Sequence, residues 1–264
     1  MPNEFYIVPE AALDATADAI RAKTGSQASI EFTQDGFADA IDDIPSGVSY
    51  ENALLDGSLS GTYENITVTS IKSGFFSGAK YPNVTFYSFP NVVTLYQDAF
   101  YQNNYITGVY LPKLQTISGM TCFGYANNNS FTALVLPSLT TIGSQAFRNM
   151  KLTSFDILGS ASGLGGAALI GCTNLNLIIL RCVTAVVACA GTNTFDSTPF
   201  ASGGTGGTIY IPKALYDHLG DGTSLDYKAA TNWSTIDGYG TITWAKIEGS
   251  YYETHYADGT LIPT

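Results

Sequence analysis

Hydrophobic positions recur along this chain with a period of 22 to 25 residues. The clearest markers are four phenylalanines, Phe76, Phe100, Phe123 and Phe147, which are separated by 24, 23 and 24 residues. A fixed period in this range is typical of a solenoid, whose units stack because none can bury its apolar side alone. The pattern therefore predicts a stacked repeat that offers a surface for binding, without a dedicated catalytic cleft.

Each unit is expected to begin with a short strand that ends at a proline. The strands are predicted at 84–89, 106–111 and 131–136, and the prolines that follow them are Pro90, Pro112 and Pro137. Proline has no N–H to donate to a sheet, so it marks the place where strand pairing stops. A leucine or valine, an isoleucine or leucine, a turn and a closing phenylalanine complete the unit before a polar loop.

The repeat becomes irregular beyond residue 150. Leu152, Phe155 and Ile157 fit a fifth strand, but a glycine-rich run replaces the proline phrase after it. The apolar stretch 175–190 predicts a buried strand pair, because it is short, rich in β-branched residues and interrupted by polar side chains. The last strand of the solenoid is predicted at 209–211.

The chain is expected to have three parts. Residues 1–48 are predicted as a helical segment that anchors or oligomerises the protein, and 49–212 as the solenoid with its N-terminal cap. Residues 213–264 are predicted as an α+β cap, with helices at 214–219 and 227–233, a strand at 241–247 and a hairpin around Asp258-Gly259. The fold class is thus a mainly β solenoid of short parallel strands.

Composition narrows the classes of partner. Charged residues make up 12% of the chain and the net charge is −11. Nucleic acid and anionic membrane surfaces are therefore not expected partners, because both require clustered Lys and Arg. No basic region followed by an apolar run opens the chain, so no signal peptide is predicted, and no segment predicts a membrane span.

Catalytic and cofactor-binding patterns are not found in the sequence. The four cysteines form no CxxC pair and are expected to be mostly buried thiols, and neither a metal site nor a cofactor is predicted. The two histidines, His218 and His255, lie outside the repeats and are interpreted as surface residues. Carboxylate pairs such as Asp217 with Asp221, or Asp42 with Asp43, fit helix ends and turns better than a glycosidase site. The sequence predicts a protein that is not an enzyme, with a carbohydrate-active enzyme as a remote alternative.

Two groups of side chains are candidate contact residues. Alternation along the strands predicts one outward-facing row, consisting of Ser88, Tyr110, Val135, Asp156, Ile179 and Tyr210. A second group, Tyr96, Tyr101, Tyr105 and Tyr110, is close together within one repeat. Exposed apolar and aromatic side chains favour interaction sites. Two alternatives remain open: loops or the cap cover part of the row, and the tyrosines are ordinary residues without a role in binding.

The repeat closely resembles the BspA-type leucine-rich repeat. Its "LPxLxxIxxxAF" phrase is best matched by residues 136–147, LPSLTTIGSQAF, and the resemblance covers about half of the chain. The phrase "IYIPKAL … YKAATNW" near the C-terminus also resembles the terminal segment of many repeat proteins of gut bacteria. The resemblance implies a leucine-rich repeat scaffold that binds a protein or a cell-wall glycan.

Residues 10–47 resemble a short N-terminal segment of phage and prophage tail-associated proteins of Gram-positive gut bacteria. The similarity rests on the phrase "ADAIRAKTG … GFADAI". It implies a virion or tail accessory protein that displays the solenoid toward a host cell, and it would account for the missing signal peptide. The alternative is a bacterial surface adhesin of the BspA type, exported by a route that the sequence does not reveal.

Overall fold

The computed structural model describes residue 54 and residues 57–126, 129–159 and 163–263. The chain divides into two compact units, Met1–Asp56 and Gly57–Thr264. The two helices expected within 1–48, and the oligomerisation expected of that segment, lie outside the described residues. The second unit is the solenoid and everything that follows it.

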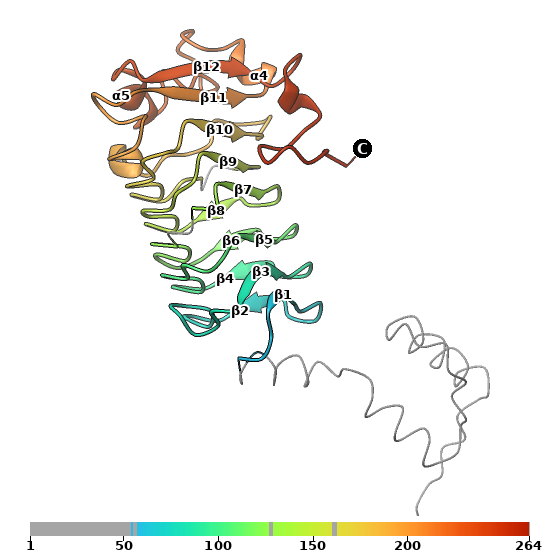
Figure 1. Cartoon of the computed structure of the whole chain (residues 1–264). Helices are drawn as coiled ribbons and strands as arrows, with labels where there is room; N and C mark the ends of the chain where they lie inside the picture. Colours follow the sequence, from blue (N-terminus) through green and yellow to red (C-terminus); the bar gives the residue numbers. More distant parts are fainter. Residues whose placement is uncertain (1–53, 55–56, 127–128, 160–162, 264) are drawn as a thin grey trace, which may run out of the picture. The chain divides into compact units, whose positions relative to one another are not determined.

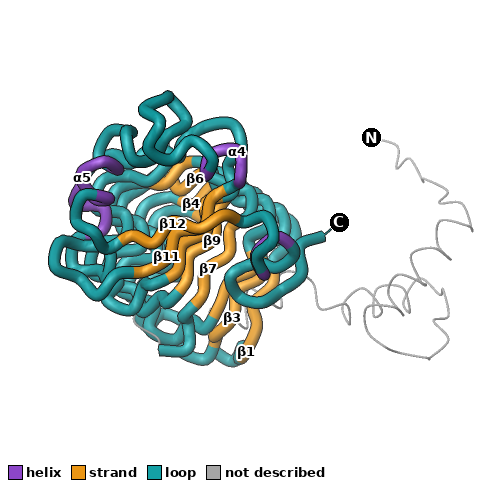
Figure 2. The backbone as a smooth tube through the Cα atoms, turned by 90° about the horizontal axis from the view of Figure 1, so that it is seen from above, coloured by secondary structure: helices purple, strands orange, loops and turns teal. Residues whose placement is uncertain are grey.

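The solenoid is built from short parallel strands that form three sheets (Figures 1 and 2). One side carries a three-stranded sheet made of β1 (Gly61–Glu64), β3 (Val84–Ser88) and β5 (Gly108–Tyr110). A five-stranded sheet follows it along the stack and consists of β7 (Ala133–Leu136), β9 (Ser154–Ile157), β10 (Leu177–Leu180), β11 (Gly207–Ile211) and β12 (Ile242–Lys246). The four-stranded sheet is made of the two-residue strands β2 (Ser70–Ile71), β4 (Thr94–Leu95), β6 (Thr116–Ile117) and β8 (Thr141–Ile142). The predicted parallel solenoid is thus confirmed.

The four repeat phenylalanines form a continuous column inside the solenoid. All four side chains are buried. The ring centroids of Phe76 and Phe100 are 5.3 Å apart, those of Phe100 and Phe123 4.9 Å, and those of Phe123 and Phe147 5.8 Å, with interplanar angles of 13°, 4° and 19°. Each ring therefore covers its neighbour, which explains why the period of the sequence tracks these residues so closely.

The units approach closely at their turns, and glycine makes this possible. Gly143 donates its N–H to the carbonyl oxygen of Ile117 at 2.9 Å. A Cβ atom at Gly143 would lie 2.1 Å from the carbonyl oxygen of Gly119 in the preceding turn, which is closer than any real contact. A side chain at this position would push two units of the solenoid apart.

Strand ends agree with the proline pattern. Pro112 and Pro137 follow β5 and β7 within two residues, and the predicted fifth strand corresponds to β9.

The strand pair expected at 175–190 is wrong in part. Only β10 is a strand there, and Cys189 makes a single bridge to Leu164. The segment after Leu180 is instead irregular, and Val187 within it is hydrogen-bonded to the side chains of Tyr227 and Trp233.

The region after Pro212 adds helices and one more strand to the stack. It contains two short helices, α4 (Lys213–Tyr216) and α5 (Trp233–Asp237), and the 3₁₀ helix η2 (Tyr251–Glu253). Another 3₁₀ helix, η1 (Thr192–Phe195), lies earlier, between β10 and β11. The helix expected at 227–233 is wrong, because a helix begins only at Trp233, after Asn232 with a φ of 64°. The strand expected at 241–247 is confirmed as β12, which pairs with β11. The boundary at residue 212 stays a prediction, although β12 continues the sheet across it.

The four cysteines are free and buried, as expected for small apolar side chains. Burial raises the pKa of the Cys122 and Cys172 thiols to about 12. None of the helices in the described part of the chain combines the length and hydrophobicity that crossing a membrane requires.

Candidate binding surface

The predicted outward row falls into two register rows, one in each of two sheets. Ser88 is aligned with Tyr110, and Val135 with Asp156, Ile179 and then Tyr210 on successive strands. The row is not uniformly exposed, however. Tyr110 is 52% exposed, whereas Asp156 and Ile179 are both fully buried. The expectation that Ile179 faces solvent is therefore wrong. Its neighbours on both sides in the register, Asp156 and Tyr210, contact a later part of the chain, at Ala257 and Tyr252.

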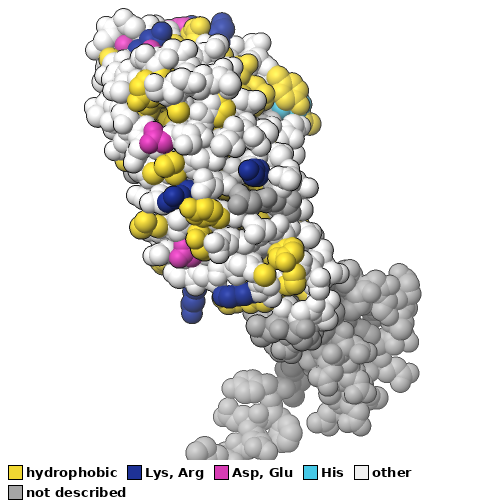
Figure 3. Space-filling view, turned by 60° about the vertical axis from the view of Figure 1, so that its left-hand side comes forward, with side chains coloured by type: hydrophobic (Ala, Val, Ile, Leu, Met, Phe, Trp, Pro, Cys, Tyr) yellow, Lys and Arg dark blue, Asp and Glu magenta, His cyan; other side chains and the backbone are white. Residues whose placement is uncertain are grey.

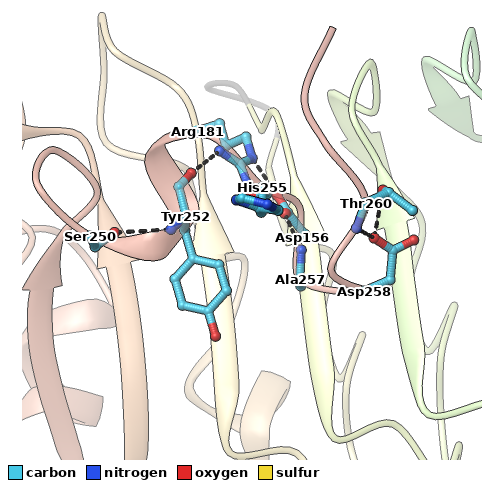
Figure 4. Close-up of polar contacts among 8 residues, drawn as sticks. All are labelled: Asp156, Arg181, Ser250, Tyr252, His255, Ala257, Asp258 and Thr260. Atoms are coloured by element: carbon cyan, nitrogen blue, oxygen red, sulfur yellow. Dashed lines mark hydrogen bonds and ion pairs between the residues drawn. The ribbon is translucent and has the colours of Figure 1, made fainter.

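That part of the chain is the segment Tyr251–Pro263, which we call the C-terminal arm. Figure 1 shows it descending beside β10 and β9 toward β7. Its contact with the sheet is centred on Asp156 and Arg181 (Figure 4). The Nε and Nη2 atoms of Arg181 donate to the two carboxylate oxygens of Asp156 at 2.6 and 2.7 Å. The N–H of Ala257 in the arm also donates to Asp156, at 3.0 Å.

Arg181 extends the same network into the arm. Its Nη1 atom donates to the carbonyl oxygen of Tyr252 and its Nη2 atom to that of His255, both at 3.0 Å. The guanidinium also lies 5.1 Å from the ring centroid of Tyr256. Burial raises the pKa of Asp156, and the Arg181 guanidinium opposes that rise. One arginine therefore joins the sheet carboxylate to the backbone of the arm.

The arm folds back on itself as a small hairpin, as the Asp258-Gly259 pair predicted. Tyr256 donates its N–H to the carbonyl oxygen of Thr260 at 2.8 Å, and Gly259 has a φ of 85°. Asp258 stabilises the turn by accepting from the N–H of Thr260 at 2.9 Å and from its hydroxyl at 2.7 Å. The tip of this hairpin faces β5 and β7.

A groove of about 540 Å³ lies between the hairpin and the sheet, and we call it the arm groove. Strands β5 and β7, with Phe86 of β3, form its floor and one wall, and Tyr256, Asp258 and Leu261 of the arm form the other. Two members of the outward row line it, Tyr110, which is exposed, and Val135, which is half-buried. This volume is within the range of roughly 300–1,000 Å³ that is typical of ligand sites.

The second candidate group is not one surface. Tyr96 follows β4 of the four-stranded sheet, whereas Tyr110 is in β5 of the three-stranded sheet. Tyr101 packs on Tyr125 at a centroid distance of 5.7 Å, and Tyr105 is 40% exposed in the loop before β5. Figure 3 shows the side of the solenoid that lies left in Figure 1, where hydrophobic side chains form separate clusters with few charges between them. Of the four tyrosines, only Tyr110 lines the groove.

The carboxylates that were weighed for catalysis have structural partners. Asp217 pairs with Lys213 one helical turn away, and Asp221 accepts from His218, with 2.6 Å between Nδ1 and Oδ2. The Thr223 N–H and His218 hold the pKa of Asp221 below its usual range. Within the described ranges, no group of three or more His, Cys, Asp and Glu side chains could hold a metal ion. Asp42 and Asp43 lie outside these ranges.

Sequence reasoning missed the residues that form the far wall of the groove and hold it in place. Arg181 was noticed only as an interruption of an apolar stretch, and Asp156 only as a member of the outward row. Their pairing could have been suspected, because opposite charges standing alone in apolar strands of adjacent repeats must be paired to be buried. Nothing in the repeat pattern indicated that the arm returns to β7.

Comparison with known protein families matches residues 53–179 to six copies of the BspA type leucine rich repeat region. A search of curated proteins found no match. The family match supports the expected resemblance for the repeats, and such repeats indicate a protein-binding or adhesion role, typically at a cell surface or outside the cell. The matched range ends within β10, so the arm, which forms one wall of the groove, lies beyond it.

Proposed function

We propose that this protein is a non-enzymatic adhesion protein that binds a partner protein through the arm groove. The observation that carries the proposal is the position of Tyr110, which is exposed, and of Val135, which is half-buried, in a groove beside the part of the row where Asp156 and Ile179 are fully buried. Tyrosine is effective in contacts because it offers a large flat apolar area and a polar tip.

The surroundings of the groove support binding rather than chemistry. Its walls are mostly aromatic, aliphatic and small side chains, and among the described residues that line it Asp258 is the one that carries a charge. General acid–base or nucleophilic catalysis needs at least two reactive groups within hydrogen-bond reach of one another. The groove therefore fits a partner that buries apolar surface.

The test is a binding isotherm of the fluorescently labelled full-length protein on intact Gram-positive gut bacteria. Three cell samples are compared: untreated, shaved of surface proteins with protease, and stripped of wall glycan. Saturable binding that is lost only on shaving supports a protein partner. Loss on glycan stripping alone would identify a glycan, and absence of saturable binding on all three would contradict the adhesion proposal.

Tyr110→Ala is the matched variant for the same isotherms. Truncating a buried aromatic contact at an interface costs about tenfold or more in affinity. Tyr96→Ala is the control, since Tyr96 is similarly exposed but lies in the loop after β4, outside the groove. Equal affinities for the two variants would move the binding surface away from the groove.

The resemblance of residues 10–47 supports a more specific proposal, that the protein is carried on a phage or prophage tail. A cell-surface adhesin is the alternative. Mass spectrometry of particles purified after induced lysis, beside the envelope fraction of the same culture, separates the two. Co-purification with tail proteins at a constant ratio supports the tail, and recovery in the envelope alone supports the adhesin.

A further inference from the structure

The arm groove is elongated along two strands. Residues 107–112 line it consecutively on the side of β5, and residues 132–135 and Pro137 line it on the side of β7. The stretch 107–112 spans about 17 Å at the rise of an extended chain, roughly 3.3 Å per residue. A groove of this shape fits a segment of polypeptide chain better than it fits a compact ligand.

A bound segment cannot join either sheet as a further strand. β5 and β7 belong to different sheets, yet their Cα atoms approach within 8 Å. A strand inserted between them would need a separation of about 9.6 Å, which is twice the usual strand spacing. Hydrogen bonds also join the two repeats, because Ser138 Oγ donates to the Pro112 carbonyl oxygen at 2.7 Å. The segment must therefore lie above the strands and contact side chains.

Aromatic rings stand on both sides of the groove. Phe86 and Tyr110 line it from β3 and β5, and Tyr256 lines it from the arm. Tyr110 is 52% exposed, and Phe86 and Tyr256 are half-buried, so each ring keeps part of its surface open. Three prolines also belong to the lining: Pro112, Pro137 and Pro263. Grooves lined by aromatic rings are the type of surface on which proline-rich segments dock.

The polar side chains of the groove favour a chain with few N–H groups. Apart from Asp258, the polar side chains that line it carry hydroxyl groups, as in Tyr110, Thr132 and Tyr256. A hydroxyl can donate to a carbonyl oxygen of the ligand. A backbone N–H that is buried without an acceptor costs free energy, whereas proline has no N–H. A polyproline II helix also needs no strand partner, because it makes no internal hydrogen bonds and keeps its carbonyl groups available.

Asp258 places one negative charge in the arm side of the groove. The two hydrogen bonds that it accepts from Thr260 both go to Oδ1, and Oδ2 accepts none from the described part of the chain (Figure 4). Residues 213–264, which include the arm, hold three Lys and seven Asp or Glu, a net charge of −4. A Lys or Arg of the ligand would therefore be attracted to this side of the groove.

We infer that the arm groove binds a proline-rich segment in the polyproline II conformation, with a Lys or Arg of the segment beside Asp258. Its proline rings pack against Phe86, Tyr110 and Tyr256, and its carbonyl oxygens accept hydrogen bonds from the hydroxyl groups of the groove. This helix rises about 3.1 Å per residue, so five or six residues span the groove. It is ordered before binding, which reduces the entropy lost in the complex. The inference rests on the proposed binding function and names the class of partner.

The test is a selection from two displayed libraries of peptides of about ten residues, with the full-length protein as the target. One library fixes two prolines three residues apart, which is one turn of the helix, and the other fixes alanine at the same positions. Both are depleted beforehand on Ala133→Trp, in which a large ring fills the groove floor. We expect enrichment from the proline library alone, with an excess of Lys and Arg at one flank. Equal enrichment from the alanine library, or none from either, would overturn the inference.

Variants of the protein then locate the enriched peptide. Tyr110→Ala should weaken its binding about tenfold or more, while Tyr96→Ala, outside the groove, should bind like the wild type. Tyr110→Ala, a surface truncation, also replaces Ala133→Trp in the depletion if that variant fails to fold. Asp258→Asn keeps an oxygen for Thr260 and removes the charge, so it should weaken the peptide about threefold. It should leave unchanged a copy of the peptide with Gln in place of the Lys or Arg, and equal effects on the two peptides would overturn the assigned contact.

N-methylation of the peptide separates this mode from strand pairing. Methyl groups on the residues that still carry an N–H remove backbone donors and leave every side chain, so affinity should change by less than about threefold. A loss of about tenfold or more would overturn the inference. If no proline-rich peptide binds but cell binding depends on Tyr110, the proposed function stands with a partner of another class. If the peptide binds the groove but intact cells do not bind the protein, the proposed adhesion fails and the preference of the groove stands.

Discussion

Replacing Arg181 tests how the arm is held against the sheet. The side chain of Asp156 is fully buried and that of Arg181 is 14% exposed. Arg181→Met removes two of the three hydrogen bonds that the Asp156 carboxylate accepts, and leaves the one from Ala257. A hydrogen bond to a charged group contributes about 1.5–3 kcal/mol. Breaking a buried ion pair from one side costs about 3–5 kcal/mol in total.

We therefore expect Arg181→Met to lower the free energy of unfolding by about 3–5 kcal/mol in urea denaturation. It should also speed cleavage within the arm by proteases, because the carbonyl groups of Tyr252 and His255 lose their donor. Lys213→Met is the matched control. It breaks a pair in which both side chains are 53% exposed, and it should cost under about 1 kcal/mol.

The double variant Asp156→Leu with Arg181→Met separates charge burial from packing. Because it leaves no unpaired charge, it should be more stable than Arg181→Met alone by roughly 2 kcal/mol or more. The reasoning is refuted if Arg181→Met costs no more than Lys213→Met. It is equally refuted if the two single effects simply add in the double variant.

Three further predictions concern the repeats. Phe123→Ala should lower the free energy of unfolding by about 3–5 kcal/mol, because it leaves a cavity in the middle of the phenylalanine column. Phe75→Ala is the control: its side chain is 44% exposed, so the free energy of unfolding should stay within about 0.5 kcal/mol of the wild-type value. Gly143→Ala should lower the midpoint of thermal unfolding, since its Cβ would meet a backbone oxygen at 2.1 Å; an unchanged midpoint would mean that the turns can separate freely. Burial raises the pKa of the Cys122 and Cys172 thiols from 9.0 to about 12. Above pH 9 these thiols ionise in the unfolded chain but not in the folded one, so the stability that they contribute below pH 9 is lost as the pH rises toward 12. The loss is about 1.4 kcal/mol per pH unit for each thiol. The wild type should accordingly lose stability over that interval more steeply than the variant with both cysteines replaced by alanine.

The repeat architecture could be predicted because its signals are local. The phenylalanine column and the prolines after the strands recur at a fixed spacing, and each unit repeats the same contacts with the next. The same spacing aligned Ser88 with Tyr110, and Val135 with Asp156, Ile179 and Tyr210, and the strand register confirms both alignments. It does not join the two sets, because β5 and β7 belong to different sheets.

The arm groove could not be predicted in the same way. Arg181 contacts His255 and Asp156 contacts Ala257, at separations of 74 and 101 residues, and no periodic pattern reports such contacts. Strands β5 and β7 belong to different sheets, and the sequence carries a sign of this change, since 25 residues separate Tyr110 from Val135 but 22 separate Ser88 from Tyr110. Spacing alone does not say whether the extra residues enlarge a loop or separate adjacent strands.

Blocking the arm groove tests the central claim most directly. Ala133 lines the groove, whereas Thr243, an exposed residue of β12 on the same register row, lies outside it. The measurement is the cell-binding isotherm of the full-length Ala133→Trp variant beside that of Thr243→Trp, after both have been shown to unfold with the midpoint of the wild type. The account predicts that Ala133→Trp loses binding about tenfold or more while Thr243→Trp binds like the wild type. Wild-type binding by Ala133→Trp would contradict the account and place the binding surface elsewhere on the protein.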